Sequence, residues 1–170
     1  MRILGLDPGL RKTGWGVIDY QGSAMSYVAD GVIKTNDKHS LAIRLAELAQ
    51  SLENILETFK PTDAAVEQVF VNKNPDSTLK LGMARGVVLM IPAKMDLEVA
   101  EYPANLVKKS VVGSGHADKN QIKAMIKMLL PKAQVQTDDA SDALAVAICH
   151  AHHVQTKNLV GGVMRGSWEG

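Results

Sequence analysis

Asp7 is the first residue of this chain whose type and position could do chemistry. It ends the apolar run of residues 3–6, and Pro8 and Gly9 turn the chain directly after it. An apolar, β-favouring run that stops at turn residues predicts a strand of a covered sheet, with Asp7 at its C-terminal end, where a ligand has room. An Asp-Pro-Gly sequence is also an ordinary turn. Asp7 therefore counts as a functional residue only if other segments supply partners for it.

Glu67 is the second such residue, because it interrupts an otherwise apolar segment. Residues 64–70 are short, apolar and β-branched, which predicts a strand covered on both faces. An ionised carboxylate in such a strand costs several kcal/mol unless it is paired or binds a metal. The alternative is a position at the rim of the sheet or in an edge salt bridge.

Asp139 and Asp142 are the third and fourth residues, and both stand at the start of a predicted helix. Residues 138–148 form a strong helix-forming segment with acids in its first turn. Acids there are also ordinary helix caps. Two acids three residues apart nevertheless share one helix face, where a cation between them would relieve their repulsion. Asp138 stands next to Asp139, so the residues alone leave open which of the two faces a site.

These four carboxylates can converge on one point if the two strands are neighbours and the helix begins beside them. Four oxygen ligands without cysteine or clustered histidine suit a hard ion such as Mg²⁺ or Mn²⁺ rather than zinc. Paired divalent ions held by carboxylates serve phosphodiester hydrolysis, by activating water and by stabilising the leaving 3′-oxygen. The pattern therefore indicates a metal-dependent nuclease.

The elements that must position these acids follow from the periodicity. Ser40 is a good N-cap for a helix over residues 41–59, whose apolar positions keep three-four spacing until Pro61 ends it. A strand, a crossover helix and a second strand predict a parallel pair. We expect an α/β fold with a mixed five-stranded sheet, an antiparallel meander followed by parallel strands, flanked by helices. The remaining strands are expected at 17–20, 25–33 and 97–102, and the helices at 77–90 (capped by Asp76 or Ser77), 105–112, 119–130 and from 138 onward.

Composition limits the possible classes of protein. With 170 residues, 46% of them hydrophobic, the chain has enough apolar material for one domain, which we place at residues 1–155. A net charge of +1 neither favours nor excludes a nucleic-acid partner. One cysteine excludes an internal disulfide, and no targeting or membrane-spanning segment is recognised, so we expect a cytoplasmic protein. The Gly-rich residues 156–170 are predicted to form a disordered tail, and His150, His152 and His153 to be surface residues rather than ligands.

The sequence closely resembles the bacterial RuvC Holliday junction resolvases, members of the RNase H-like nuclease superfamily. The matching stretches occur in order through nearly the whole chain except the tail. They are Leu-Gly-Leu-Asp-Pro-Gly (4–9), Thr-Gly-Trp-Gly-Val-Ile (13–18), Glu-Gln-Val-Phe (67–70), Leu-Lys-Leu-Gly-Met-Ala-Arg-Gly (79–86), Val-Val-Gly-Ser-Gly (111–115) and Asp-Ala-Ser-Asp-Ala-Leu-Ala (139–145).

The resemblance implies a homodimer that cuts two opposed strands of four-way junction DNA, with two Mg²⁺ ions in each active site (Mn²⁺ as a substitute) and with the RuvA–RuvB branch-migration complex as partner. It implies an RNase H-like sheet, and dimerisation through the apolar helix over 77–90. By position, Asp7, Glu67, Asp139 and Asp142 match the family's catalytic, metal-binding acids. The DNA contacts that we expect on this basis are Phe70, stacked on bases near the junction centre, the basic residues Lys108 and Lys119 near the cleaved phosphate, and Lys73, Lys80 and Arg85.

The sequence also departs from the family pattern. Pro92 stands near the end of the expected interface helix and is predicted to shorten or kink it, which makes the dimer geometry less certain than the catalysis.

Three other functions compete with the resolvase. Actin-like ATPases and sugar kinases begin with a similar Asp-x-Gly turn, but they need a second lobe for which this chain is too short. An RNase H-like nuclease acting on RNA or duplex ends is the second alternative. The third is a non-catalytic junction-binding module, which would gain nothing from four carboxylates facing phosphates.

Overall fold

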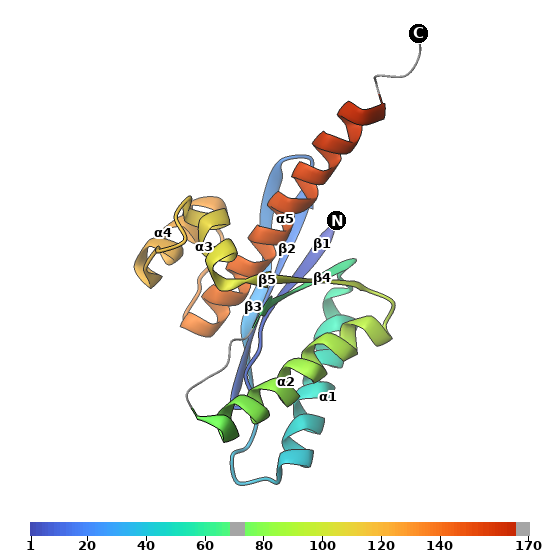
Figure 1. Cartoon of the computed structure of the whole chain (residues 1–170), viewed down its shortest axis with the longest axis vertical. Coiled ribbons are helices and arrows are strands. Elements are labelled where there is room, and N and C mark those ends of the chain that lie inside the picture. Colours follow the sequence, from blue (N-terminus) through green and yellow to red (C-terminus); the bar gives the residue numbers. More distant parts are fainter. Residues whose placement is uncertain (69–73, 166–170) are drawn as a thin grey trace.

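The computed structural model describes the backbone of residues 1–68 and 74–165, and side chains of residues 1–68 and 74–156. It consists of one five-stranded sheet in the order β3-β2-β1-β4-β5, with helices packed on both faces (Figure 1). The elements are β1 (Arg2–Asp7), β2 (Lys12–Gln21), β3 (Ala24–Lys34), α1 (Leu41–Phe59), β4 (Asp63–Gln68), α2 (Pro75–Lys94), β5 (Glu98–Pro103), α3 (Ala104–Val112), α4 (Lys119–Leu129) and α5 (Asp138–Arg165).

The sheet is mixed, as the sequence predicts. β1, β2 and β3 form an antiparallel meander, whereas β4 pairs with β1 and β5 pairs with β4 in parallel. The tight turn between β2 and β3 uses Gly22, whose φ of 66° favours glycine. The parallel pairing of β1 with β4 requires a crossover, which α1 supplies. The predicted fold class is therefore confirmed.

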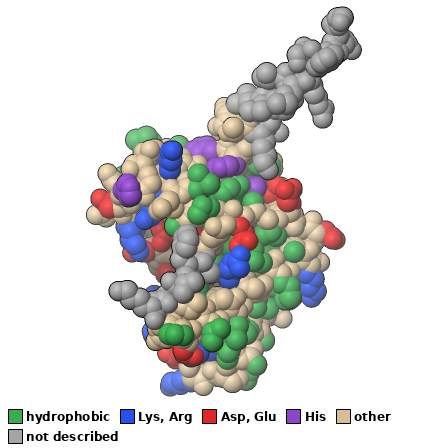
Figure 2. Space-filling model, in the orientation of Figure 1, with side chains coloured by type: hydrophobic (Ala, Val, Ile, Leu, Met, Phe, Trp, Pro, Cys, Tyr) green, Lys and Arg blue, Asp and Glu red, His purple; other side chains and the backbone are tan. Residues whose placement is uncertain are grey.

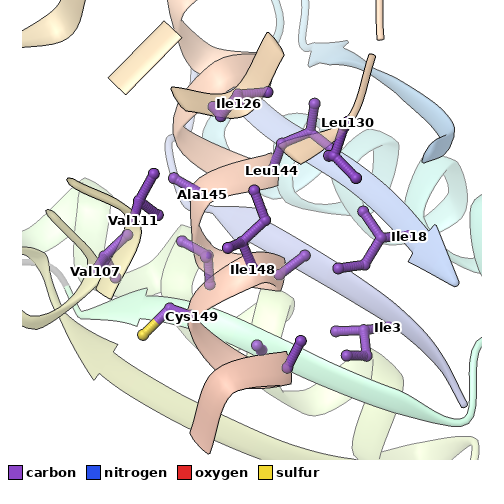
Figure 3. Close-up of a cluster of buried hydrophobic side chains, with 14 of the residues drawn as sticks. Ile3, Ile18, Val107, Val111, Ile126, Leu130, Leu144, Ala145, Ile148 and Cys149 are labelled. Atoms are coloured by element: carbon purple, nitrogen blue, oxygen red, sulfur yellow. The ribbon is translucent and has the colours of Figure 1, made fainter. Parts of the chain in front are cut away.

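Each face of the sheet carries its own hydrophobic core, because successive strand residues point to opposite faces. On one face, Ile3 and Ile18 pack with α3, α4 and α5 around Leu144 and Ile148 (Figure 3). Cys149 lies in the same cluster. On the other face, strand residues including Leu4, Leu6 and Val17 pack against the buried sides of α1 and α2.

Three glycines let α5 lie directly on β1 and β2. A Cβ at Gly5 would stand 2.1 Å from the carbonyl oxygen of Ala143, and one at Gly14 would stand 2.0 Å from that of Asp139. At Gly16 the nearest atom would be Leu144 Cδ2, at 2.7 Å. Real Cβ atoms do not approach backbone oxygen this closely, so only glycine allows this contact between helix and sheet.

The ends of α2 differ from the prediction. The helix begins at Pro75, and Asn74, rather than Asp76 or Ser77, is the N-cap: its side chain accepts the N–H groups of Asp76 at 3.0 Å and Ser77 at 3.3 Å. Asparagine caps well, and proline suits the first helical turn. At the other end the helix continues through Pro92 to Lys94, so Pro92 does not cut it short. A proline in the last turn removes a single helical hydrogen bond.

The last helix also extends beyond its predicted range. α5 reaches Arg165 and so includes residues 156–165 of the segment predicted to be a disordered tail, while residues 166–170 lie outside the described part of the chain. In the part of the chain that the structure describes, no helix combines the length and the apolar character needed to cross a membrane.

Candidate active site

Asp7 and Glu67 lie side by side at one edge of the sheet. The parallel register of β1 and β4 pairs Leu6 with Val66, so the next residues along, Asp7 and Glu67, leave the two strands together. Both side chains are partly buried. The strand pattern predicted this juxtaposition, because the C-terminal ends of neighbouring parallel strands meet at one edge.

The start of α5 is placed above these strand ends by Gly14. In the antiparallel register of β1 and β2, Asp7 is paired with Gly14. Gly14 in turn leaves just enough space for the backbone of Asp139, in the first turn of α5. Asp142, one helical turn further, is thereby held over the end of β1. The sequence identified these acids, but it did not indicate that Gly14 determines how closely the start of α5 approaches the sheet.

A pocket of about 200 Å³ lies where these elements meet, and we call it the catalytic pocket. It is bounded by the ends of β1 and β4, the first turns of α3, α4 and α5, and a small apolar wall. Three of the four predicted acids line it, and so do both lysines predicted to lie near the cleaved phosphate. The lining residues are Asp7, Glu67, Ala104, Val107, Lys108, Lys119, Ile122, Asp142 and Ala145.

The acids of the catalytic pocket hold their protons unusually strongly. Burial, followed by the charges of Glu67, Asp142 and Asp139, raises the pKa of Asp7 to about 8. Burial and the charge of Asp142 raise the pKa of Glu67 to about 7, with Lys108 acting in the opposite direction. Burial likewise raises the pKa of Asp142. These carboxylates therefore cannot all be ionised near neutral pH without a compensating positive charge.

The chemistry of this donor set fits a divalent cation. Hard oxygen ligands without sulfur or imidazole suit Mg²⁺-like ions. Within the described residues, no three side chains of the metal-binding types are gathered closely enough to form a finished metal site. A cation bound among these carboxylates would remove their mutual repulsion. Asp139 does not line the pocket, but its charge contributes to the raised pKa of Asp7.

Asp138, the acid whose role the sequence left open, binds two lysines of α4. Its carboxylate oxygens lie 3.2 Å from Lys119 Nζ and 2.5 Å from Lys123 Nζ. Hydrogen bonds from these two lysines lower the pKa of Asp138, opposite to the shift of the acids in the pocket. Asp138 therefore belongs to the surface between α4 and α5. The i, i+4 spacing of Lys119 and Lys123 was a signal for this contact that sequence reasoning did not use.

The other predicted DNA contacts are not part of the catalytic pocket. Lys80 Nζ forms an exposed ion pair with Asp76 at 2.7 Å, within α2. Arg85, also on α2, holds Glu101 of β5, with its Nε 2.9 Å from the carboxylate oxygen. Phe70 and Lys73 lie outside the described residues.

The predicted surface position of His150 is wrong. This side chain is 6% exposed, and its Nδ1 lies 2.8 Å from the hydroxyl of Tyr102 on β5. Its Nε2 lies 3.7 Å from a carboxylate oxygen of Asp63, at the start of β4. His152 and His153 are partly buried. α5 packs against the sheet over more residues than its apolar pattern predicted. His150 therefore faces the core.

Comparison with known proteins agrees with this geometry. Residues 3–150 match the family described as crossover junction endodeoxyribonuclease RuvC. The crossover junction endodeoxyribonuclease RuvC of Xanthobacter autotrophicus is 61% identical over 153 residues, which cover 90% of each chain. Among solved structures, Thermus thermophilus RuvC in complex with Holliday junction substrate superposes with a TM-score of 0.86 at 28% identity, covering 92% of this chain and 96% of that one. The yeast mitochondrial Holliday junction resolvase shares the fold, with a TM-score of 0.65 at 15% identity, over 91% of this chain and 81% of its own.

The mixed sheet, with acids gathered where β1, β4 and α5 meet, defines the class: an RNase H-like nuclease. Membership of such a class implies a divalent-metal requirement. More particularly, the chain belongs to the RuvC family of crossover junction endodeoxyribonucleases.

Proposed function

We propose that this protein is a structure-selective DNA endonuclease that resolves four-way (Holliday) junctions in recombination and repair, by cutting two opposed strands symmetrically. The observation that carries the proposal is the catalytic pocket, which brings three acids with raised pKa values together with two lysines. The likeness to the Thermus thermophilus RuvC structure, which contains a Holliday junction, supports the choice of substrate.

Asp7, Glu67, Asp139 and Asp142 are the residues we assign to two Mg²⁺ ions, with Mn²⁺ as a substitute. Bound there, the ions would supply an activated water and neutralise charge at the phosphate. Apolar side chains, Val107 among them, form part of the pocket wall and lower the polarity around the acids. The positions of Asp7 and Glu67 are fixed by paired strands, so little reorganisation is needed when substrate binds.

Lys108 and Lys119 are assigned to the cleaved phosphate. They reach the pocket from two different helices, α3 and α4, and so flank the acids. Their positive charge offsets the carboxylates that would otherwise repel DNA. Lys80 and Arg85 on α2, and Phe70 and Lys73 after β4, remain proposed contacts to other parts of the junction.

We assign a homodimer to the outer face of α2. Ala84, Val88 and Ile91 are buried on the inner side of this helix. Large apolar side chains are exposed on it as well, namely Leu79 (64%), Met83 (45%) and Met90 (54%). A second copy of the same surface would cover them, and two active sites would then face two opposed strands. Partnership with the RuvA–RuvB branch-migration complex and action in the cytoplasm are proposed with this function.

The deciding experiment is cleavage of a mobile synthetic four-way junction, with Mg²⁺ or with chelator, resolved on denaturing gels. Paired nicks at symmetric positions that need Mg²⁺ are the expected result. Linear duplex and an RNA–DNA hybrid serve as controls. Preferential cutting of either control would replace the resolvase with another RNase H-like nuclease, and junction binding without any cutting would favour a non-catalytic binding module.

A further inference from the structure

α4 presents a row of three lysines toward the start of α5. Lys119, Lys123 and Lys127 are spaced four residues apart, so they share one helix face. The side chains of Lys119 and Lys123 are 65% and 43% exposed. Figure 2 shows basic and acidic side chains mixed at the side of the molecule where Figure 1 places α4. The first lysine lines the catalytic pocket, and the row leads away from it.

The other two lysines line a second, larger hollow, which we call the α4–α5 cavity. Its volume is about 580 Å³, and it lies between α4, the segment 131–137 and the first turn of α5. Its polar side chains are two lysines, two glutamines and one serine, with no acid and no aromatic ring. The lining residues are Lys123, Ile126, Lys127, Pro131, Ala133, Gln134, Val135, Gln136 and Ser141.

Asp138 connects this cavity to the catalytic pocket. One of its oxygens binds Lys119, which lines the pocket, and the other binds Lys123, which lines the cavity. The same carboxylate therefore pairs with both lysines in the free protein and offsets part of their charge. Lys127 forms no ion pair within the described residues, so its charge stays uncompensated there.

We propose that the α4–α5 cavity binds backbone phosphates of the DNA strand that occupies the catalytic pocket, through Lys123 and Lys127. In this arrangement Asp138 holds Lys119 and Lys123 until phosphate takes its place. The inference rests on the proposed function, since it names the path of the same substrate beyond the cleaved bond.

The chemistry of the lining favours phosphate over a base. Lysine ammonium groups and side-chain amides are typical donors to phosphate and sugar oxygens, and the cavity lining includes no aromatic ring on which a base could stack. Exchange of Asp138 for phosphate is inexpensive, because solvent and salt screen an exposed ion pair strongly. Phosphate contacts also release counterions from DNA, which a carboxylate contact does not.

The test is the salt dependence of junction binding, measured with chelator present so that no cutting occurs. Each lost phosphate contact lowers the slope of log affinity against log salt by about 0.9, so the loss of affinity between 50 and 200 mM salt becomes roughly 3.5-fold smaller. We expect this change for Lys127→Gln and for Lys123→Gln. If both protomers of a dimer contact the junction, the slope falls by about 1.8 and the loss of affinity becomes roughly 12-fold smaller. Lys94→Gln is the matched control, because Lys94 is an exposed lysine at the far end of α2 that pairs with Glu53.

Asp138→Asn should change junction affinity and its salt slope in the opposite direction. Freed of Asp138, Lys119 and Lys123 should bind the junction more tightly, with a steeper salt slope. Thr137 Oγ1 accepts the N–H of Ala140 at 3.2 Å, so the helix keeps its cap in this variant. Weaker binding by Asp138→Asn, or slopes for Lys123→Gln and Lys127→Gln equal to that of Lys94→Gln, would overturn the inference. Failure of the unaltered protein to bind the junction would instead overturn the proposed function.

Discussion

α2 and α5 are both rich in apolar residues, yet α2 is half exposed, whereas α5 is largely buried over residues 140–151. In α5 the buried positions of the first turns include five alanines, and two of them, Ala143 and Ala147, lie against Gly5 of β1. In α2 only one side is buried, and leucine and methionine cover the outside. The five alanines of α5 are Ala140, Ala143, Ala145, Ala147 and Ala151.

The difference lies in what faces each helix. α5 packs on a sheet that has glycine at positions 5, 14 and 16, so its backbone can lie directly on the strands. Gly82 and Gly86 of α2 face no atom within 4 Å of an added Cβ. Small residues thus fix the position of one helix and leave the other with an open surface. The first arrangement suits the placing of catalytic acids, and the second suits a partner.

The largest expected effect comes from adding one methyl group beneath α5. Gly14→Ala places a Cβ 2.0 Å from the carbonyl oxygen of Asp139, where no side-chain rotation can relieve the clash. We expect a loss of about 4 kcal/mol or more in the free energy of unfolding, measured by urea denaturation. The matched change in α2, Gly86→Ala, should be neutral or stabilise by up to about 1 kcal/mol. Equal stability of the two variants would mean that α5 is not seated on the sheet as described.

A change in charge alone should separate cutting from binding. Asp7→Asn keeps the shape of the side chain but removes a charge from the catalytic pocket, so we expect junction cutting to fall on the order of 10³-fold while junction binding remains. The measurements are single-turnover cleavage and a binding isotherm. Asp96→Asn is the control, since Asp96 is exposed at the end of α2 and its φ of 61° is one that asparagine tolerates. Loss of binding together with cutting would identify Asp7 as a folding residue.

On α2, a charge should affect association rather than folding. Met83→Lys places an ammonium group on the exposed apolar side, and we expect the dimer dissociation constant to rise about tenfold or more, which corresponds to about 1.4 kcal/mol. Sedimentation at several concentrations measures it. Met128→Lys is the control, because Met128 is 71% exposed on α4, away from the proposed interface. An unchanged dissociation constant would move the interface elsewhere.

The smallest effect concerns pH. Folding raises the pKa of Asp7 from 3.8 to about 8 and that of Glu67 from 4.5 to about 7. Between the lower and the upper value of each residue, the folded state therefore binds more protons than the unfolded state. In chelator, the free energy of unfolding should therefore fall as pH rises through this range. We expect Asp7→Asn to stabilise the protein at pH 8 by on the order of 1 kcal/mol, and by less at about pH 5.5. If the free energies of unfolding of Asp7→Asn and the unaltered protein differed by the same amount at both pH values, the stabilisation would not come from the charge of Asp7.

Much of this arrangement could be predicted from local pattern. The early strands and their glycine turns predicted the antiparallel part of the sheet. The positions of Asp7, Glu67 and the acids at the helix start predicted their convergence, which the pocket shows for Asp7, Glu67 and Asp142 but not for Asp139. These predictions succeed because periodicity and turn residues act over a few positions. The parallel pairing then follows from the crossover helix.

The remaining features depend on contacts between distant segments. His150 is buried because Tyr102 and Asp63, from two other strands, surround it, and no local pattern carries that information. The position of Asp138 likewise depends on two lysines of α4, which hold it at the surface. Helix length was underestimated in α5, where glycines after position 160 indicated a tail although the backbone stays helical to Arg165.

The enclosure of α5 also gives the protein a built-in reporter of its own opening. Cys149, the one cysteine of the chain, is fully buried, and burial raises the pKa of its thiol to about 11. At neutral pH the group is therefore both shielded and protonated, whereas alkylating reagents need an accessible thiolate. The rate at which such a reagent modifies the native protein should track the rare separation of α5 from the sheet, so that residue-level opening can be followed by mass spectrometry without any engineered label.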